Sequence, residues 1–79
     1  MSNTLESTIT TFQAYAWEEN LMSDTLISKL NISDKDMDAL IFELDIDNGI
    51  EFTDEDIKAI KHLATIQDVV NFIENYLVQ

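Results

Sequence analysis

The sequence has no cysteine and a single histidine, and these two shortages exclude several kinds of chemistry. Without thiols the chain can form neither a disulfide framework nor a cysteine-ligated zinc site. With His62 as the only imidazole, we also expect no catalytic triad and no histidine-rich metal site. His62 is therefore expected to be structural or simply exposed.

Arginine is missing too, and four lysines face sixteen aspartates and glutamates, which gives a net charge of −12. Such a field repels phosphate backbones and anionic membrane surfaces, so we expect neither a nucleic acid nor a membrane as partner. Because complementary charge steers association, the expected partners are proteins with a basic patch, or metal cations. The simpler alternative is that the acidity only keeps the protein in solution.

Long apolar runs are lacking as well. The longest, Ala14 to Trp17 and Ala39 to Phe42, are far too short to cross a bilayer. The polar start MSNTLEST has neither the basic end nor the apolar segment of a signal peptide. We therefore expect a cytoplasmic monomer in which residues 1–79 form one domain.

Proline does not occur and glycine occurs once, at Gly49, which favours helices joined by short polar links. Apolar residues at spacings of three and four predict a first helix over Thr4–Trp17. Its Ile9 and Phe12 flank a threonine-rich face that we expect to be polar. The apolar connector EENLMSDTLISKLN should then lie across the helices and close one end of the core.

A hydroxyl residue followed three positions later by an aspartate marks three further helix starts. The pairs are Ser33 with Asp36, Thr53 with Asp56, and Thr65 with Asp68. They predict a second helix that Ser33 caps and Gly49 ends, a short third helix after Thr53, and a fourth after Thr65. The predicted fold class is all-α, a four-helix bundle with a short third helix.

The apolar stripes of these helices give the expected core. Its members are Ile9, Phe12, Leu26, Leu30, Leu40, Ile41, Leu44, Ile57, Ile60, Val69, Phe72 and Ile73. Tyr15, Trp17 and Phe42 are expected in the core or at its edge, because no basic residues are interleaved with them to hold a nucleic acid.

Carboxylates are the main candidates for chemistry. A catalytic pair needs a cleft in which the two pKa values are pushed apart, whereas these acids fall on outward helix faces. We therefore predict no catalytic residue, and a protein that is not an enzyme.

A calcium-binding protein is an alternative that the acids raise. A calcium loop beginning at Asp34 would need glycine where Ala39 stands and glutamate where Asp45 stands. A loop beginning at Asp45 has Gly49 one place early and Asp56 at its twelfth position. Neither loop matches, so we predict no dedicated metal site.

The second half of the chain resembles the acyl carrier proteins, a family of acidic single domains of about this length. The similar stretch is ELDIDNGIEFTDEDIKAIKHLATIQDVVNFIENYL, with TIQDVVNFI as its most specific part, and DTLISKLNI is more loosely similar. The resemblance implies a carrier-protein fold whose second helix docks on partner enzymes. It also implies 4′-phosphopantetheine on the serine of an Asp-Ser-Leu motif at the start of that helix.

The sequence departs from the family at this motif. An ungapped alignment from either flank puts Ser33 on the motif's aspartate, Asp34 on its modified serine and Lys35 on its leucine. A carboxylate cannot accept the phosphopantetheinyl group as a hydroxyl does. In one interpretation the register slips and Ser33 carries the group, although its side chain would point roughly 100° away from the usual direction. In the other, which we favour, the fold lacks the arm and Ser33 only caps the helix.

Without the arm, the resemblance implies a non-catalytic docking module. The expected partner-binding residues form an outward acidic stripe: Asp34, Asp38, Asp45, Asp47, Glu51, Asp54 and Glu55. Their partner would be a basic patch on an enzyme of fatty-acid or polyketide type acyl metabolism, or on a regulator that carrier proteins contact. The alternatives are a working acyl carrier with 4′-phosphopantetheine on Ser33, a calcium-binding protein, and a stripe that is only solvated surface.

Overall fold

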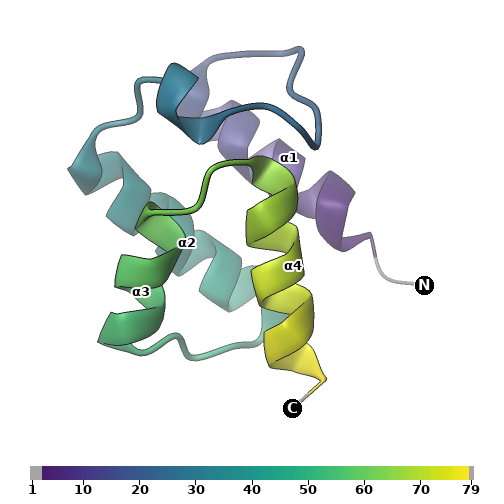
Figure 1. Cartoon of the computed structure of the whole chain (residues 1–79), viewed down its shortest axis with the longest axis vertical. Helices are drawn as coiled ribbons and strands as arrows, with labels where there is room; N and C mark the ends of the chain where they lie inside the picture. The colour runs from purple at the N-terminus through teal and green to yellow at the C-terminus, as the bar shows by residue number, and fades with distance from the viewer. Residues whose placement is uncertain (1–2, 79) are drawn as a thin grey trace.

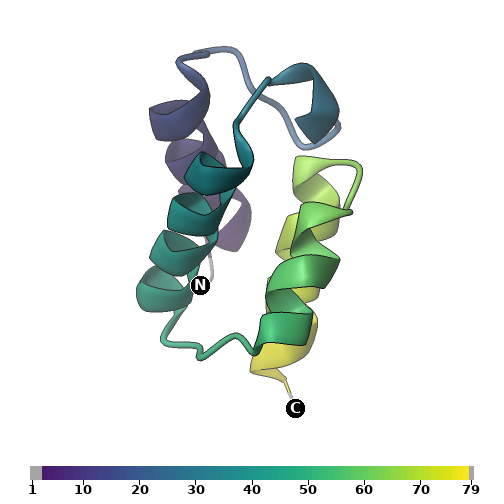
Figure 2. The same ribbon diagram turned by 90° about the vertical axis from the view of Figure 1, so that its left-hand side faces the viewer.

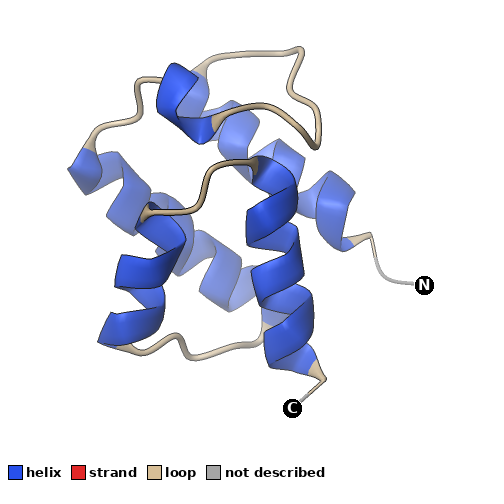
Figure 3. Cartoon of the chain, viewed as in Figure 1, coloured by secondary structure: helices blue, strands red, loops and turns tan. Residues whose placement is uncertain are grey.

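The structure, a computed structural model, describes residues 3–78 and is helical throughout (Figure 3). Its elements are α1 (Thr4–Ala16), the short 3-10 helix η1 (Ile27–Lys29), α2 (Asp34–Asn48), α3 (Asp54–Lys61) and α4 (Ile66–Leu77). Within residues 3–78 the only β-type pairing is an isolated bridge between Leu26 and Thr65. The predicted all-α fold with four α-helices and a short third helix is confirmed. None of the described helices is long and apolar enough to cross a bilayer.

The helices form two layers. α1 packs against α4 and α2, and α2 also packs against α3. Figures 1 and 2 show α1 and α2 side by side in one layer and α3 with α4 in the other. The core lies between the layers, where the apolar stripes of all four helices meet.

The connector between α1 and α2 crosses one end of the bundle, as expected (Figures 1 and 2). Its backbone carbonyls accept hydrogen bonds from the first turn of α4, because Ile66 N–H donates to Thr25 O at 3.3 Å and Gln67 N–H donates to Ser23 O at 2.8 Å. Helix N-termini leave such N–H groups without partners inside the helix. The connector therefore closes the core and caps α4 at the same time.

The three predicted helix starts are confirmed. At Thr53 and Thr65 both halves of a capping box form, since the hydroxyl accepts the aspartate's N–H and the carboxylate accepts the threonine's N–H. At the start of α2 the Ser33 hydroxyl accepts the Asp36 N–H at 3.1 Å, without the reciprocal bond that completes a box. The α2 start therefore depends on the Ser33 hydroxyl alone for its side-chain cap.

Gly49 ends α2 in the left-handed conformation, with φ 64°, as predicted. α1 ends one residue earlier than predicted, at Ala16, because Trp17 adopts a left-handed conformation with φ 57° and its N–H donates to Gln13 O. Left-handed backbone is uncommon for a bulky residue. The strain at Trp17 turns the chain out of α1 and into the connector.

Most of the expected core is confirmed. Phe12, Leu40, Ile41, Leu44, Ile60, Val69 and Ile73 are buried, and Ile9, Leu30, Ile57 and Phe72 are half-buried against them. Leu26 was expected there wrongly: its side chain is 44% exposed, because its backbone is held in the bridge to Thr65. The prediction was also wrong for Trp17, which is 93% exposed because it follows the end of α1 in left-handed backbone, and for Phe42, which is 65% exposed because it lies off the inward face of α2. Tyr15 does lie at the core edge.

The threonine-rich face of α1 is the other correction. Thr4, Thr8 and Thr11 are buried, although the sequence predicts that this face is polar. Thr11 satisfies its hydroxyl by donating to Ser7 O at 3.2 Å, one turn back in the helix. Thr8 is completely buried, and its hydroxyl has no hydrogen-bond partner within the described part of the chain. α1 therefore packs through small β-branched residues, which allow a close approach to its neighbours.

Candidate functional site

The start of α2 is the position that the sequence singles out, and three residues define it. Ser33 is exposed, with extended backbone at φ −65° and ψ 160°, and its oxygen caps the helix. Asp34 is the first residue of α2, and its side chain is 82% exposed. Lys35 is exposed beside it. The predicted role of Ser33 as a helix cap is thus confirmed.

Lys61, the last residue of α3, reaches across to this helix start. Its Nζ lies 3.0 Å from Asp34 Oδ1 and 2.6 Å from Asp38 Oδ1, and the two carboxylates are one helical turn apart. Hydrogen bonds to Asp38 and then to Asp34 raise the pKa of Lys61 above its usual value. The side chain of Lys61 is only 21% exposed, whereas the two carboxylates that its ammonium contacts are 82% and 56% exposed. This Lys61 clamp ties the end of α3 to the start of α2.

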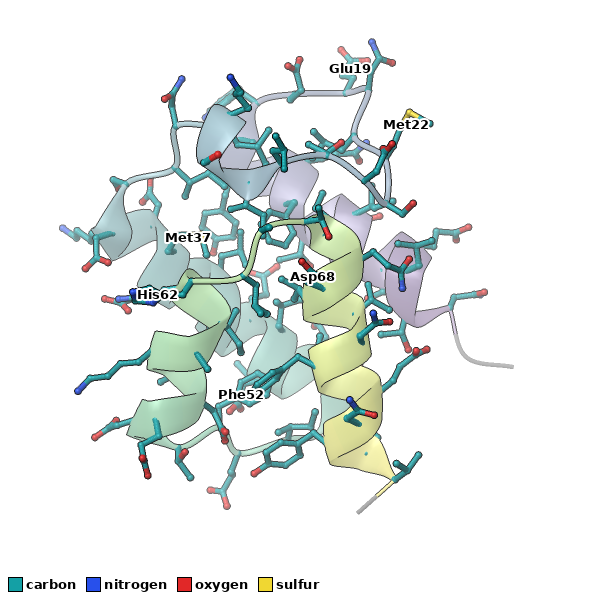
Figure 4. All side chains as sticks on the ribbon, in the orientation of Figure 1. Glu19, Met22, Met37, Phe52, His62 and Asp68 are labelled. Atoms are coloured by element: carbon teal, nitrogen blue, oxygen red, sulfur yellow. The ribbon has the colours of Figure 1, made fainter. Side chains whose placement is uncertain are left out.

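A cavity of about 430 Å³ opens beside the clamp, between the connector, the start of α2 and the end of α3. Its walls are mainly apolar, with Ile32, Met37 and Leu63 among them, and Asp34, Lys61 and His62 also line it. Figure 4 shows Met37 and His62 on their two elements. The His62 ring nitrogen Nδ1 is 2.9 Å from Lys58 O, and the side chain is exposed, as the sequence suggests.

The acidic stripe divides into three groups. Asp34 and Asp38 belong to the Lys61 clamp. Asp45 is half-buried, and its Oδ2 accepts the Phe52 N–H at 2.8 Å, so this carboxylate holds the link between α2 and α3. The remaining residues, Asp47, Glu51, Asp54 and Glu55, are exposed. They come from the end of α2, the link and the start of α3, which lie at the same end of the bundle (Figure 2).

The two carboxylates that the calcium hypothesis uses at Asp45 and Asp56 are committed elsewhere. Asp45 accepts the Phe52 N–H, and Asp56 Oδ2 accepts the Thr53 N–H at 3.0 Å in the capping box of α3. Within residues 3–78, no group of three or more histidine and acidic side chains is placed to hold a metal ion. Asp45 and Asp56 therefore make hydrogen bonds that stabilise the fold.

Sequence reasoning missed two features of this region. Lys61 was not singled out, because its partners are on another helix and only the tertiary fold brings them together. Phe42 and Ile46 are exposed on α2, 65% and 60%, and Phe42 lines a second cavity of about 390 Å³. The signal for the second feature was present in the sequence, since both residues fall one turn apart and off the stripe of Leu40 and Leu44.

The fold and the α2 start together define a helical carrier-type domain, with an acidic second helix that begins at a serine cap. A scan against models of known protein families finds no match for this chain. An acyl carrier protein of Coprothermobacter proteolyticus is 34% identical to it over 77 residues, which span 98% of this chain and 85% of that protein. The chain belongs to the acyl carrier protein family.

Acyl carrier proteins normally carry 4′-phosphopantetheine on the serine that begins the second helix. The ungapped alignment of the sequence assigns that position to Asp34, which has no hydroxyl to esterify and whose carboxylate is bound by Lys61. The side chain at the family's attachment position therefore does not fit the group. Ser33 offers a hydroxyl one residue earlier, but its oxygen is already the acceptor that caps α2.

Proposed function

We propose that this protein is a non-catalytic docking module of the acyl carrier protein family that lacks the phosphopantetheine arm. Its partner is a basic patch on a protein of fatty-acid or polyketide type acyl metabolism. The observation that carries this proposal is the Asp34–Lys61 ion pair at 3.0 Å, because it gives the residue at the attachment position a structural role. A carboxylate bound in this way holds two helices together and offers nothing to a group-transfer reaction.

Charge supports the docking part of the proposal. The net charge is −12, and Asp47, Glu51, Asp54 and Glu55 project from one end of the bundle. Exposed charges of one sign attract an oppositely charged surface and accelerate its approach. The Lys61 clamp neutralises the part of the acidic stripe that lies at the start of α2. The exposed acids at the opposite end, around the α2–α3 link, therefore contribute more to docking.

A working carrier with the arm on Ser33 is the second candidate. The observation in its favour is that Ser33 is exposed at the helix start and is the one hydroxyl next to the family's attachment position. Modification there would convert the capping hydroxyl into a phosphate ester. The cap on α2, which has no reciprocal bond from Asp36, would then be weakened.

Intact mass separates the two candidates. The purified protein is incubated with coenzyme A and a phosphopantetheinyl transferase of broad specificity, alongside a conventional carrier protein as positive control. We expect the mass of the wild-type chain to stay unchanged while the control gains the group. A mass increase that Ser33→Ala abolishes would overturn the proposal and establish Ser33 as the acceptor.

A further inference from the structure

The single glycine of the chain directly follows an asparagine. The pair is Asn48 and Gly49, and it lies where α2 ends and the α2–α3 link begins (Figure 2). Asparagine is one of the thermolabile residues, because the next backbone nitrogen can attack its side-chain carbonyl carbon. Glycine hinders this attack least, since it has no Cβ. Each of the other asparagines is followed by a larger residue, so the sequence singles out Asn48.

Two hydrogen bonds hold the groups that this attack requires. Asn48 Nδ2 donates to Leu44 O at 2.8 Å, and Gly49 N–H donates to Ile46 O at 3.2 Å. The first bond gives a partner to one of the carbonyls that the end of a helix leaves unsatisfied. It also fixes the side-chain amide, while the second bond engages the attacking nitrogen. The pair therefore cannot react while both bonds are intact.

Little else has to move for these two bonds to break. Gly49 is exposed and Asn48 is half-buried, and a Cβ placed on Gly49 would meet no atom within 4 Å. The next residue, Ile50, is by contrast only 4% exposed, and its N–H donates to Asp45 O at 2.9 Å. Helix ends open locally at a much lower free energy than the whole fold. The pair can therefore open while Ile50 stays in the core.

We propose that Asn48 is a modification site, which converts spontaneously to aspartate or isoaspartate when the end of α2 opens locally. The Gly49 nitrogen loses its proton to a base in solution and forms a bond to Asn48 Cγ. The bond from Cγ to Nδ2 then breaks, and the nitrogen takes up protons from water and leaves as ammonia. Water opens the resulting five-membered imide at either carbonyl. One opening gives aspartate, and the other gives isoaspartate, in which the main chain runs through the side-chain carbons.

Either product weakens the end of α2. A carboxylate has no N–H to donate to Leu44 O, and its negative charge is unfavourable at the C-terminal end of a helix. Isoaspartate also lengthens the main chain, which displaces the N–H groups of Gly49 and Ile50 from their acceptors. The modification adds one negative charge beside the exposed Asp47. This inference goes beyond the proposed function and does not depend on it.

High-resolution mass spectrometry of the full-length chain during prolonged incubation tests the proposal. Conversion raises the mass by the difference between water and ammonia, and peptide mapping locates the change. The incubations are made at neutral and mildly alkaline pH, without urea, in urea well below the unfolding midpoint, and in urea that unfolds the chain. Asn48→Gln is the matched control, because its longer side chain would have to form a six-membered ring. Asn20, which is exposed but precedes Leu21, is the control within the same chain.

We expect the folded wild type to gain this mass at Asn48, faster at alkaline pH and several-fold more slowly than the unfolded chain. Because the opening is local, urea below the midpoint should leave the rate unchanged. Asn48→Gln and Asn20 should stay unmodified over the same period. A folded chain that keeps its mass while the unfolded chain converts would overturn the proposal. A rate that rises with urea below the midpoint, or conversion first at Asn20, would also overturn it.

Hydrogen exchange tests the predicted effect on the helix end. Asn48→Asp reproduces one of the two products and is compared with the wild type in its folded state. The amides of Gly49 and Ile50 should exchange with solvent faster in the variant, whereas those of α4 should exchange at the wild-type rate. Equal exchange at Gly49 and Ile50 in both proteins would show that the Asn48 side-chain bond does not hold the end of α2.

Discussion

Thr8 is the residue whose environment conflicts most with its chemistry. It is completely buried in α1, and its hydroxyl has no hydrogen-bond partner within the described residues. A buried hydroxyl without a partner has lost its water without compensation, and this destabilises the folded state. Valine has nearly the same shape and carries no polar atom at that position.

Thr8→Val is therefore expected to raise the free energy of unfolding by about 1 kcal/mol. Urea denaturation followed by circular dichroism measures the change. Thr10→Val is the matched control, because Thr10 is exposed and donates to Glu6 O at 3.0 Å, so its replacement should not stabilise the protein. A lower stability for Thr8→Val would mean that the hydroxyl is bonded after all.

Ser33 is the second residue with a role that one substitution can isolate. Its hydroxyl is the only side-chain cap that α2 has within the described structure, since Asp36 does not return the bond. Ser33→Ala should lower the free energy of unfolding by about 1 kcal/mol, and Ser33→Asp should restore most of it because a carboxylate also caps a helix. Thermal and urea unfolding of the three proteins give the comparison. Equal stability of all three would show that the cap contributes nothing.

At the scale of the helices, two contacts join elements that are far apart in the sequence. The Lys61 clamp joins α3 to α2, and the Tyr15 hydroxyl donates to Glu43 Oε1 at 3.2 Å, which joins α1 to α2. The pKa of Tyr15 is raised by burial first and by the bond to Glu43 second. The pKa of Lys61 is raised as well, by its hydrogen bonds to Asp38 and Asp34.

Both shifts act on stability in the same direction. A group whose pKa is higher in the folded state keeps its proton longer there than in the unfolded chain, so its contribution is complete at neutral pH. The contribution is lost as pH rises from the ordinary pKa of the group toward the raised one. The protein should therefore lose stability above about pH 10, where lysine and tyrosine normally titrate.

Urea midpoints measured from neutral to alkaline pH test this expectation. The wild type should lose stability above about pH 10, and Tyr15→Phe and Lys61→Met should each reduce this loss while lowering stability at neutral pH. Lys58→Met is the control for Lys61, since Lys58 is exposed on the same helix and makes no ion pair within the described chain. An unchanged alkaline slope in both variants would contradict the assignment.

Helix starts and ends could be predicted from the sequence because their signals are local. Ser33, Thr53 and Thr65 each place an oxygen within reach of the N–H three residues on, and Gly49 tolerates the left-handed backbone. The Lys61 clamp and the burial of Thr8 could not be predicted, because they depend on which helices meet. Phe42 was misplaced because an aromatic side chain on an amphipathic helix usually faces the core.

At the scale of the whole molecule, charge is distributed unevenly. The clamp pairs Asp34 and Asp38 with Lys61, whereas Asp47 and Asp54 are exposed at the opposite end of α2 and at the start of α3. Asp45, which the sequence places in the same stripe, accepts a hydrogen bond from Phe52 N–H. Its replacement by lysine would remove this bond as well as the charge, so Asp45 is left unchanged in the charge-reversal test. The end of the bundle that carries Asp47 and Asp54 should therefore dominate attraction to a basic partner.

A lysine-rich synthetic helical peptide that has glutamines in place of apolar residues serves as the basic probe. Asp47→Lys/Asp54→Lys is expected to bind it several-fold more weakly than the wild type at low ionic strength, and the two proteins should bind it almost equally in high salt. Fluorescence anisotropy of the labelled peptide provides the measurement, and circular dichroism confirms unchanged helicity. Glu18→Lys/Glu19→Lys, at two exposed acids of the connector between α1 and α2, is the control with the same change in net charge. If the control variant binds the peptide as weakly as Asp47→Lys/Asp54→Lys does, net charge alone, and not this surface, determines binding.

The central claim is that Asp34 has replaced the attachment serine and that the protein works without the arm. Its most direct measurement is the intact mass of two proteins treated side by side with phosphopantetheinyl transferase and coenzyme A: the wild type and Asp34→Ser. We predict that the wild type keeps its mass and that Asp34→Ser, which regains a hydroxyl at the family's position, gains the phosphopantetheinyl group. A wild-type chain that gains the group to the same extent would contradict the account.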